Sequence, residues 1–172
     1  MSAHVLNPIQ GATRGVAVKY LTFRLGRESY GIAVLKVREI IRLQALTFVP
    51  QMPAHFKGVV NLRGKIVPVI DLRLKFGLDD IGDRERTCIV VVQIDTASQR
   101  DLTAGVIVDE VEEVTQIAGA DIEPAPDFGT EADTQYIQGI ARIKGVAKIL
   151  LHIDRVVSAK TIERTNQLSL EP

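Results

Sequence analysis

The feature that most constrains the fold is an internal duplication of short apolar segments. A pattern around residue 60 recurs 81 positions later, and a pattern around residue 35 recurs 74 positions later. The first set matches Gly58, Val59, Leu62, Gly64, Val69, Ile70 and Leu72 with Gly139, Ile140, Ile143, Gly145, Leu150, Leu151 and Ile153. The second matches Gly31, Ile32, Val34, Val37, Glu39 and Ile40 with Gly105, Val106, Val108, Val111, Glu113 and Val114. Recurrence of one supersecondary unit predicts two related lobes.

Both halves of the chain have the pattern of short strands. Apolar and polar residues alternate from Val18 to Leu25, and the turn residues Gly26 to Ser29 follow. The ten expected strands, five in each half, are 18–25, 30–33, 40–41, 59–62, 66–70, 87–94, 103–108, 111–117, 137–143 and 146–151. One helical turn is expected at 34–37 and a C-terminal helix from Asp154 to Ile162. The sequence therefore predicts an all-β fold of small closed barrels, which leave no exposed sheet edges.

Pattern and composition also divide the chain into segments. Residues 1–15 have no sustained period and are expected to form a flexible N-terminal segment. The folded domain is expected at 16–160, with lobes at about 16–80 and 84–160. Whether the lobes exchange strands is left open, and residues 161–172 are expected to be a C-terminal tail.

Composition argues against several classes of protein. The formal net charge is +0, there is no Trp and aromatic residues make up 5%, which disfavours a nucleic-acid binder that relies on a basic field and stacking rings. The single cysteine, Cys88, cannot form an intramolecular disulfide, and no apolar run resembling a signal peptide occurs in 1–19. Apolar runs are about five residues long, against about 20 for a membrane-spanning helix. We therefore expect a cytoplasmic protein without direct membrane insertion.

Residues suited to catalysis or metal binding are few and scattered. His4, His55 and His152 belong to no metal-binding or catalytic spacing, and Cys88 opens an apolar strand. The segment 58–66 differs from a phosphate-binding loop because five residues separate its glycines and no Ser or Thr follows Lys65. The acidic run 109–113 alternates with valines and is expected to be a solvated face. We therefore expect no enzyme activity, no cofactor and no metal.

A charged hairpin tip and a mixed strand are the distinctive surface features. Arg63 precedes Gly64, which is expected to supply the positive φ of a hairpin turn. The strand Val37 to Ile40 places Arg and Glu beside aliphatic residues. Apolar area for attraction and charges for register are typical of a protein-binding surface.

Several segments together closely resemble the CheW family of chemotaxis coupling proteins. The matching residues are 20–23, 30–32, 37–41, 58–64, 68–73, 105–109 and 122–126, so the resemblance covers about residues 17–158 in order. Membership would imply two five-stranded SH3-like barrels around a shared apolar core, and no catalytic activity.

The resemblance also implies a function and a set of site residues. The family joins the cytoplasmic tips of methyl-accepting chemotaxis receptors to the regulatory domain of the histidine kinase CheA, so recruitment to receptor arrays at the inner membrane face is expected. Receptor-contacting positions of the family match Val37, Glu39 and Arg63, with Gly58 close by. Val37 would supply an apolar contact, Glu39 and Arg63 polar contacts, and Gly58 a close backbone approach. Positions near the groove between lobes match Cys88 and Val114.

Three alternatives stay open at this point. One is an adaptor of a paralogous chemosensory pathway, such as one that controls surface motility. The second is a nucleic-acid-binding barrel, and the third is a protein that binds a small molecule, or a cryptic enzyme, in the groove around Cys88.

Overall fold

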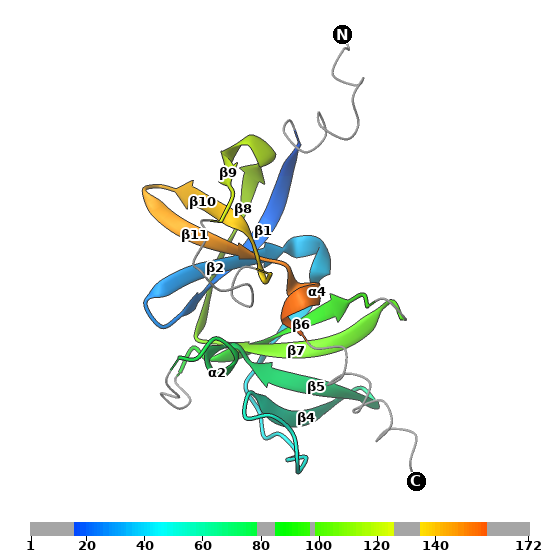
Figure 1. The fold of residues 1–172 in the computed structure, drawn as a ribbon. Helices are drawn as coiled ribbons and strands as arrows, with labels where there is room; N and C mark the ends of the chain where they lie inside the picture. Colours follow the sequence, from blue (N-terminus) through cyan, green and yellow to red (C-terminus); the bar gives the residue numbers. More distant parts are fainter. Residues whose placement is uncertain (1–15, 79–84, 97–98, 126–134, 158–172) are drawn as a thin grey trace.

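The computed structural model describes residues 16–78, 85–96, 99–125 and 135–157, and these form two β-sheets (Figure 1). The strands are β1 (Ala17–Leu25), β2 (Glu28–Ala33), β3 (Val37–Arg42), β4 (Phe56–Leu62), β5 (Lys65–Asp71), β6 (Cys88–Ile94), β7 (Leu102–Val108), β8 (Glu110–Ala118), β9 (Ile122–Glu123), β10 (Ile137–Ile143) and β11 (Val146–Leu151). The short helices are η2 (Val34–Lys36), α2 (Leu72–Lys75), η3 (Gly119–Asp121) and α4 (Ile153–Val156). The expected all-β fold of two small lobes is confirmed.

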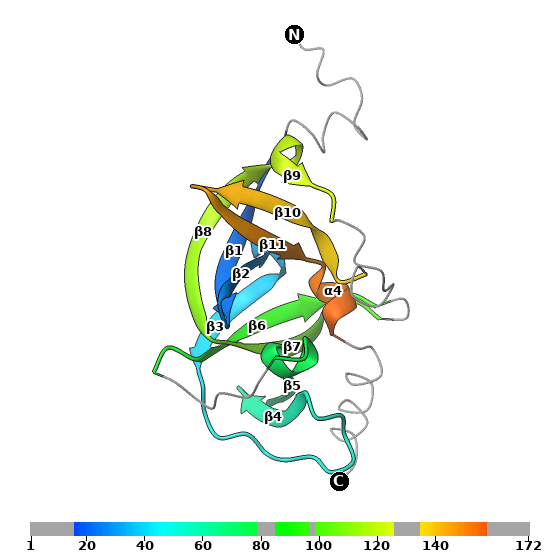
Figure 2. The same ribbon diagram turned by 60° about the vertical axis from the view of Figure 1, so that its left-hand side comes forward.

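Each sheet takes strands from both halves of the sequence. The central lobe has the strand order β3-β6-β7-β5-β4, and the terminal lobe has the order β8-β1-β2-β11-β10-β9. The ranges 16–80 and 84–160 therefore each contribute to both lobes. Strands β1 and β2 of the first range belong to the terminal lobe, and β6 and β7 of the second range belong to the central lobe. Figure 2 shows the two lobes stacked, with β6 and β7 of the central lobe lying below the strands of the terminal lobe.

The duplication seen in the sequence is repeated in the strand register. Val69 of β5 pairs in parallel with Gly105 of β7, and Leu150 of β11 pairs in parallel with Gly31 of β2. The members of these pairs are related by the same shifts of 81 and 74 positions. Both glycines are required by close packing, since an added Cβ would lie 2.8 Å from a methyl carbon of Ile89 at Gly105 and 2.9 Å from one of Leu150 at Gly31. The two lobes are therefore copies of one unit.

The terminal lobe contains one strand more than the sequence predicted. Strand β9 pairs with β10 through Ile140 and Glu123, and the equivalent position in the central lobe is an isolated bridge between Val59 and Thr47. A two-residue strand lies below the length at which alternation is recognisable. The sixth strand therefore could not be predicted from the pattern.

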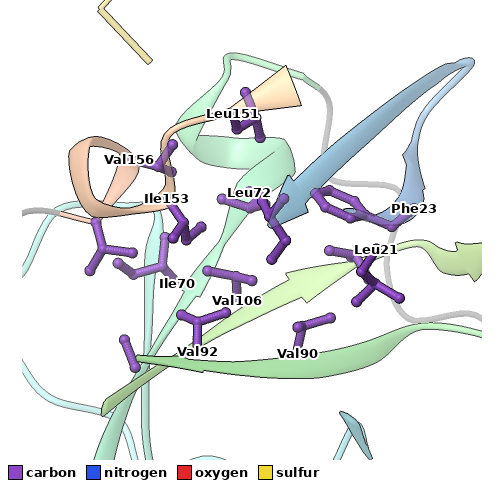
Figure 3. Packing of buried hydrophobic residues seen from close by; sticks show 14 of the residues in the cluster. Leu21, Phe23, Ile70, Leu72, Val90, Val92, Val106, Leu151, Ile153 and Val156 are labelled. Atoms are coloured by element: carbon purple, nitrogen blue, oxygen red, sulfur yellow. The ribbon is translucent and has the colours of Figure 1, made fainter. Parts of the chain in front are cut away.

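The buried apolar side chains of the described residues form three clusters. One small cluster fills each barrel, around Val67 and Ile107 in the central lobe and around Tyr20 and Leu150 in the terminal lobe. The largest lies between the lobes (Figure 3), and the members that the figure labels are Leu21, Phe23, Ile70, Leu72, Val90, Val92, Val106, Leu151, Ile153 and Val156. The two barrels thus share a core, as the family resemblance implied.

The two predicted helical segments are both present in part. The single turn expected at 34–37 is η2. The C-terminal helix begins one residue earlier than expected as α4, and its Val156 and the following Val157 are 0% and 2% exposed. Residues 158–162 of the predicted helix lie outside the described residues.

The acidic run 109–113 is not one solvated face, and that expectation was wrong. Asp109 lies at the junction of the lobes, where its Oδ1 is 3.1 Å from Nε of the buried Arg73 and its Oδ2 accepts a 2.7 Å hydrogen bond from the backbone N–H of Gly26. Glu112 accepts hydrogen bonds from Ser29 and, at 3.3 Å, from Nζ of Lys148. Two of these carboxylates therefore neutralise buried cations, a pairing that the local sequence does not reveal.

Candidate functional site

Strand β3 carries two of the predicted site residues, but on opposite faces. Val37 pairs with Val92, which belongs to the shared core, whereas Glu39 pairs with Val91, which lines the central barrel. The register shifts between Val37 and Glu39, so a bulge at Arg38 reverses the alternation that normally puts residues i and i+2 on one face. Val37 is half-buried against the shared core, and Glu39 faces the open end of the central barrel.

Arg63 occupies the tip of the β4–β5 hairpin in a left-handed conformation. Its φ is 51° and that of Gly64 is 84°, which is the combination found in a two-residue type I′ turn. The side chain of Asn61 accepts a 2.9 Å hydrogen bond from the N–H of Gly64 and supports this turn. The sequence predicted positive φ for Gly64 alone. Lys144 has a φ of 52° at the matching position of the β10–β11 hairpin, so the left-handed conformation belongs to this type of turn.

The side chain of Arg63 forms an ion pair with Glu39. The guanidinium and the carboxylate face each other through two contacts, of which Nη1 to Oε1 is 3.4 Å and Nη2 to Oε2 is shorter. The hydrogen bond and the charge of Glu39 raise the pKa of Arg63. The pair ties the edge strand β3 to the tip of the β4–β5 hairpin. These two strands lie at opposite ends of the sheet, so the contact closes the rim of the barrel.

An open groove of about 610 Å³ lies beside this ion pair at the mouth of the central lobe. Its floor is apolar and its rim is charged. The lining residues are Arg38, Glu39, Leu62, Arg63, Lys65, Val67, Val91, Asp101 and Thr103. A surface of this composition can take an apolar side chain on the floor and polar groups at the rim, and it brings Glu39 and Arg63 together as the sequence analysis expected.

Gly58 lies beneath this region rather than on its surface. Its φ is +142°, and a Cβ there would lie 2.4 Å from the carbonyl oxygen of Thr47. Thr47 exchanges backbone hydrogen bonds of 2.8 and 2.9 Å with Val59, so the segment after β3 is fastened across β4. The close backbone approach that Gly58 makes is therefore to the same chain.

Cys88 and Val114 lie on the side of the two sheets that faces the shared core. Cys88 is half-buried, and burial raises the pKa of its thiol while the backbone of Val111 partly offsets this. Val114 is 54% exposed on the edge strand β8, opposite Leu21. The geometry thus places both residues at the junction of the lobes, away from the Glu39–Arg63 pair.

Two exposed apolar residues near this junction were missed in the sequence analysis as individual candidates. Ile40 on the edge strand β3 is 46% exposed and pairs with Val90 of the shared core. Leu35 in η2 is 89% exposed. A signal was present for Ile40, because it follows Glu39 and matches Val114 of the duplicated unit.

Among the described residues, the site consists of apolar and charged side chains that can bind a partner. No group of three His, Cys, Asp or Glu side chains converges to hold a metal ion in the part of the chain that the structure describes. Within the same residues, the search for an apolar helix long enough to cross a bilayer finds none. Fold and site together define a class: a two-lobed β-barrel protein with exposed apolar edge strands and a charged rim, suited to binding other proteins.

Comparison with known proteins identifies the family. Residues 19–161 match the family model of the CheW-like domain. The chain is 37% identical over 145 residues to the chemotaxis protein CheW of Klebsiella aerogenes, which covers 84% of each chain, and 34% identical over 130 residues to the protein FrzA of Myxococcus xanthus, covering 74% of this chain and 76% of that one. The crystal structure of the scaffolding protein TtCheW from Thermoanaerobacter tengcongensis matches with a TM-score of 0.73 at 34% identity, covering 85% of this chain and 91% of that one. The chain belongs to the CheW family.

Family membership confirms the two SH3-like lobes and the general function. The protein is a CheW-type adaptor, a scaffold of chemotaxis signalling. The match to FrzA shows that the relatives of this chain include a protein with a name other than CheW. Scaffolding is a binding function, which agrees with a site built from apolar edges and a charged rim.

Proposed function

We propose that this protein couples the cytoplasmic tips of methyl-accepting chemotaxis receptors to the regulatory domain of the histidine kinase CheA, without catalysing a reaction itself. The proposal rests on family membership and on one observation in particular. The edge strand β3 presents exposed Ile40 on one face, and the Glu39–Arg63 pair on the other face of the strand holds it in place.

The receptor-binding surface is proposed to be the β3 edge and the junction next to it. Glu39 and Arg63 lie on this surface, whereas Val37 and Gly58 support it from within the protein. Val37 packs the start of β3 against the shared core, and Gly58 allows the segment after β3 to pack closely on β4. Apolar contact to the receptor would come from Ile40 and from Val114 across the junction. This division of roles supports a receptor helix that lies against two edge strands.

The two lobes give the adaptor separate faces for its two partners. Holding a receptor tip and a kinase domain on one molecule raises their effective concentration relative to each other. For the receptor state to change kinase activity, the contacts must differ between the kinase-on and kinase-off arrangements. Recruited in this way, the protein would act on the cytoplasmic side of the membrane within receptor arrays.

The test is co-sedimentation of the purified protein with receptor-containing membranes and CheA, with kinase phosphorylation measured in the same tubes. Ile40→Ser is the test variant, and Val146→Ser is the matched control, because Val146 is also an exposed apolar strand residue, at 51%, but lies in the terminal lobe. The proposal expects roughly tenfold weaker receptor recruitment for Ile40→Ser and no change for Val146→Ser. Equal recruitment by both variants would remove the β3 edge from the receptor-binding surface.

The family match to FrzA favours one addition to this test. Receptors and kinases of more than one chemosensory pathway belong in the panel, since family membership alone is compatible with an adaptor of a paralogous pathway. Recruitment by one set only would assign the pathway. No recruitment by any set would overturn the proposed partners.

A further inference from the structure

The duplication provides an internal comparison between two short helices, each of which follows the second strand of a duplicated hairpin. Helix α2 follows β5, and α4 occupies the equivalent position after β11, 81 residues later. Lys75 and Phe76 are therefore the counterparts of Val156 and Val157. Val156 and Val157 are buried, whereas Lys75 and Phe76 are only half-buried. Beside Lys75 and Phe76 lies a hollow of about 410 Å³.

Aromatic rings form the walls of this hollow. The rings lie in a row in the order Tyr30, Phe76 and Tyr136. Their centroids are 5.8 Å apart for the first pair and 6.3 Å apart for the second. The residues that match Tyr30 and Tyr136 in the duplicated unit are Ala104 and His55, so the duplication does not repeat these two phenol rings. Ile137, Ile149 and Leu151 complete the lining. At these spacings the three rings contact one another, so together they form a continuous aromatic wall against which a further flat ring can stack.

One cation lies at the edge of the aromatic walls. The ammonium of Lys75 is 5.4 Å from the ring centroid of Tyr136 and has no carboxylate partner among the residues that the structure describes. Burial, followed by the charge of Lys75, lowers the pKa of the neighbouring His55, so this histidine is neutral near pH 7. Burial and then Glu28 raise the pKa of Tyr30, so its phenol keeps its proton. The site thus offers flat apolar walls, a neutral hydroxyl and one positive charge.

We propose that this hollow binds a small planar aromatic carboxylate, with the ring stacked among Tyr30, Phe76 and Tyr136 and the carboxylate at Lys75. The volume lies within the range of about 300 to 1,000 Å³ that is typical of small-molecule sites. A protein partner is disfavoured because most large exposed apolar residues, such as Leu35, Ile40, Phe48 and Val114, lie elsewhere. Leu78, which follows Gly77 of the lining, adds only a small apolar area beside the hollow.

Such a ligand would contact both lobes at once. Tyr30, Ile137, Ile149 and Leu151 belong to the terminal lobe, and Lys75 and Phe76 follow from the central lobe. A ligand that binds only the folded protein raises its stability in proportion to ln(1 + [L]/Kd). Binding therefore strengthens the junction of the lobes, independently of whether receptors or CheA are the partners.

The experiment uses 2-naphthoate as the probe and 2-naphthylmethanol as its uncharged analogue, with the full chain. The protein contains no Trp, so the naphthyl fluorescence anisotropy is measured without tryptophan background. The test variant is Lys75→Gln. The matched control is Lys144→Gln, which removes a lysine from the exposed tip of the β10–β11 hairpin.

The expected result is saturable binding of 2-naphthoate, at least fivefold tighter than that of the alcohol. Lys75→Gln removes this preference and Lys144→Gln preserves it. Tyr136→Leu weakens both ligands, and a thermal melt reports whether each variant is folded. If Lys75→Gln does not fold, Lys75→Arg serves instead and must keep the preference for the anion. Non-saturable binding, or an anion preference that survives in Lys75→Gln, overturns the proposal.

Discussion

Arg63 and Glu39 bind each other across the mouth of the central lobe, which gives them a structural role that the sequence did not indicate. The sequence analysis expected each to contact a receptor side chain directly. In the structure, the guanidinium of one is satisfied by the carboxylate of the other, and the pair joins the first and last strands of the sheet. Both roles involve the same residues, but they predict different outcomes when the charges are exchanged.

Exchange of the two charges separates these roles. Glu39→Arg and Arg63→Glu each place like charges together at the rim, so each is expected to lose receptor recruitment. The double variant restores an attractive pair and is expected to regain most of the recruitment, measured by co-sedimentation with receptor membranes.

The control for charge reversal is Arg86→Glu, which disrupts another exposed pair, Arg86 with Glu110 at 3.3 Å. It should leave recruitment unchanged. If the double variant melts like the wild type but recruits receptors as poorly as the single variants, the partner contacts the two charged side chains directly.

Gly58→Ala tests the seating of the segment after β3. The new Cβ would meet the Thr47 carbonyl at 2.4 Å in a backbone conformation that disfavours side chains, and we expect a loss of roughly 2 to 5 kcal/mol in the free energy of unfolding from strain and overpacking. Gly64→Ala is the comparison, because its Cβ would meet nothing within 4 Å and only the positive φ contributes, at about 1 to 2 kcal/mol. Urea denaturation measures both, and similar losses would contradict the close contact.

How far the sequence predicts this molecule depends on whether the signal is local. Strand positions, the hairpin at Arg63 and the duplication follow from alternation and from matched residues such as Gly58 and Gly139. The exchange of strands does not follow, because each half has the same pattern and either copy of a strand would complete either barrel. The bulge that turns Val37 and Glu39 to opposite faces is also invisible, since alternation alone puts them on one face.

Contacts between distant segments account for the rest of what the sequence missed. Asp109 and Arg73 are 36 positions apart, and nothing in the run of acidic residues indicates that one of them is drawn into the junction of the lobes. The family resemblance predicts which surface binds the receptor, but it does not indicate which of these residues pair with each other and which remain exposed.

Arg73→Met tests the buried ion cluster at the junction of the lobes. Arg73 is 2% exposed and lies 3.5 Å from Asp71 and 3.1 Å from Asp109. Removing one member of a buried ion pair leaves the other charge uncompensated, which typically costs about 3 to 5 kcal/mol. Arg155→Met, at an exposed position, is the control and should cost under about 0.5 kcal/mol. Urea denaturation measures the free energy of unfolding of both variants. Equal stability would contradict a stabilising role for Arg73 at the junction of the lobes.

Ile70→Ala tests which face of β5 points to the shared core. Ile70 is 0% exposed and packs in the cluster between the lobes. Lost burial and the resulting cavity are expected to lower the free energy of unfolding by about 2 to 5 kcal/mol. Ile40→Ala on the exposed edge should change it by less than about 0.5 kcal/mol. An Ile70→Ala variant that melts like the wild type would contradict the packing.

Acid stability tests the pairing of Glu112 with Lys148. Burial alone would raise the pKa of Glu112, but the hydrogen bonds from Ser29 and Lys148 outweigh it and lower the pKa below its ordinary value of 4.5. Because the pKa is lower in the folded than in the unfolded state, ionised Glu112 stabilises the fold above pH 4.5, and this contribution is lost as the pH falls through the folded-state pKa.

Glu112→Gln removes that contribution at all pH values. The stability difference between wild type and Glu112→Gln should therefore shrink as the pH falls from about 6 to about 3, measured by urea denaturation at each pH. Glu123→Gln, at an exposed position, supplies the baseline. A difference that stays constant or grows with acid would mean that Lys148 is neutralised in some other way. A difference that shrinks identifies Glu112 as the stabilising partner of a buried lysine in the terminal lobe, where the central lobe has Val67 at the equivalent position.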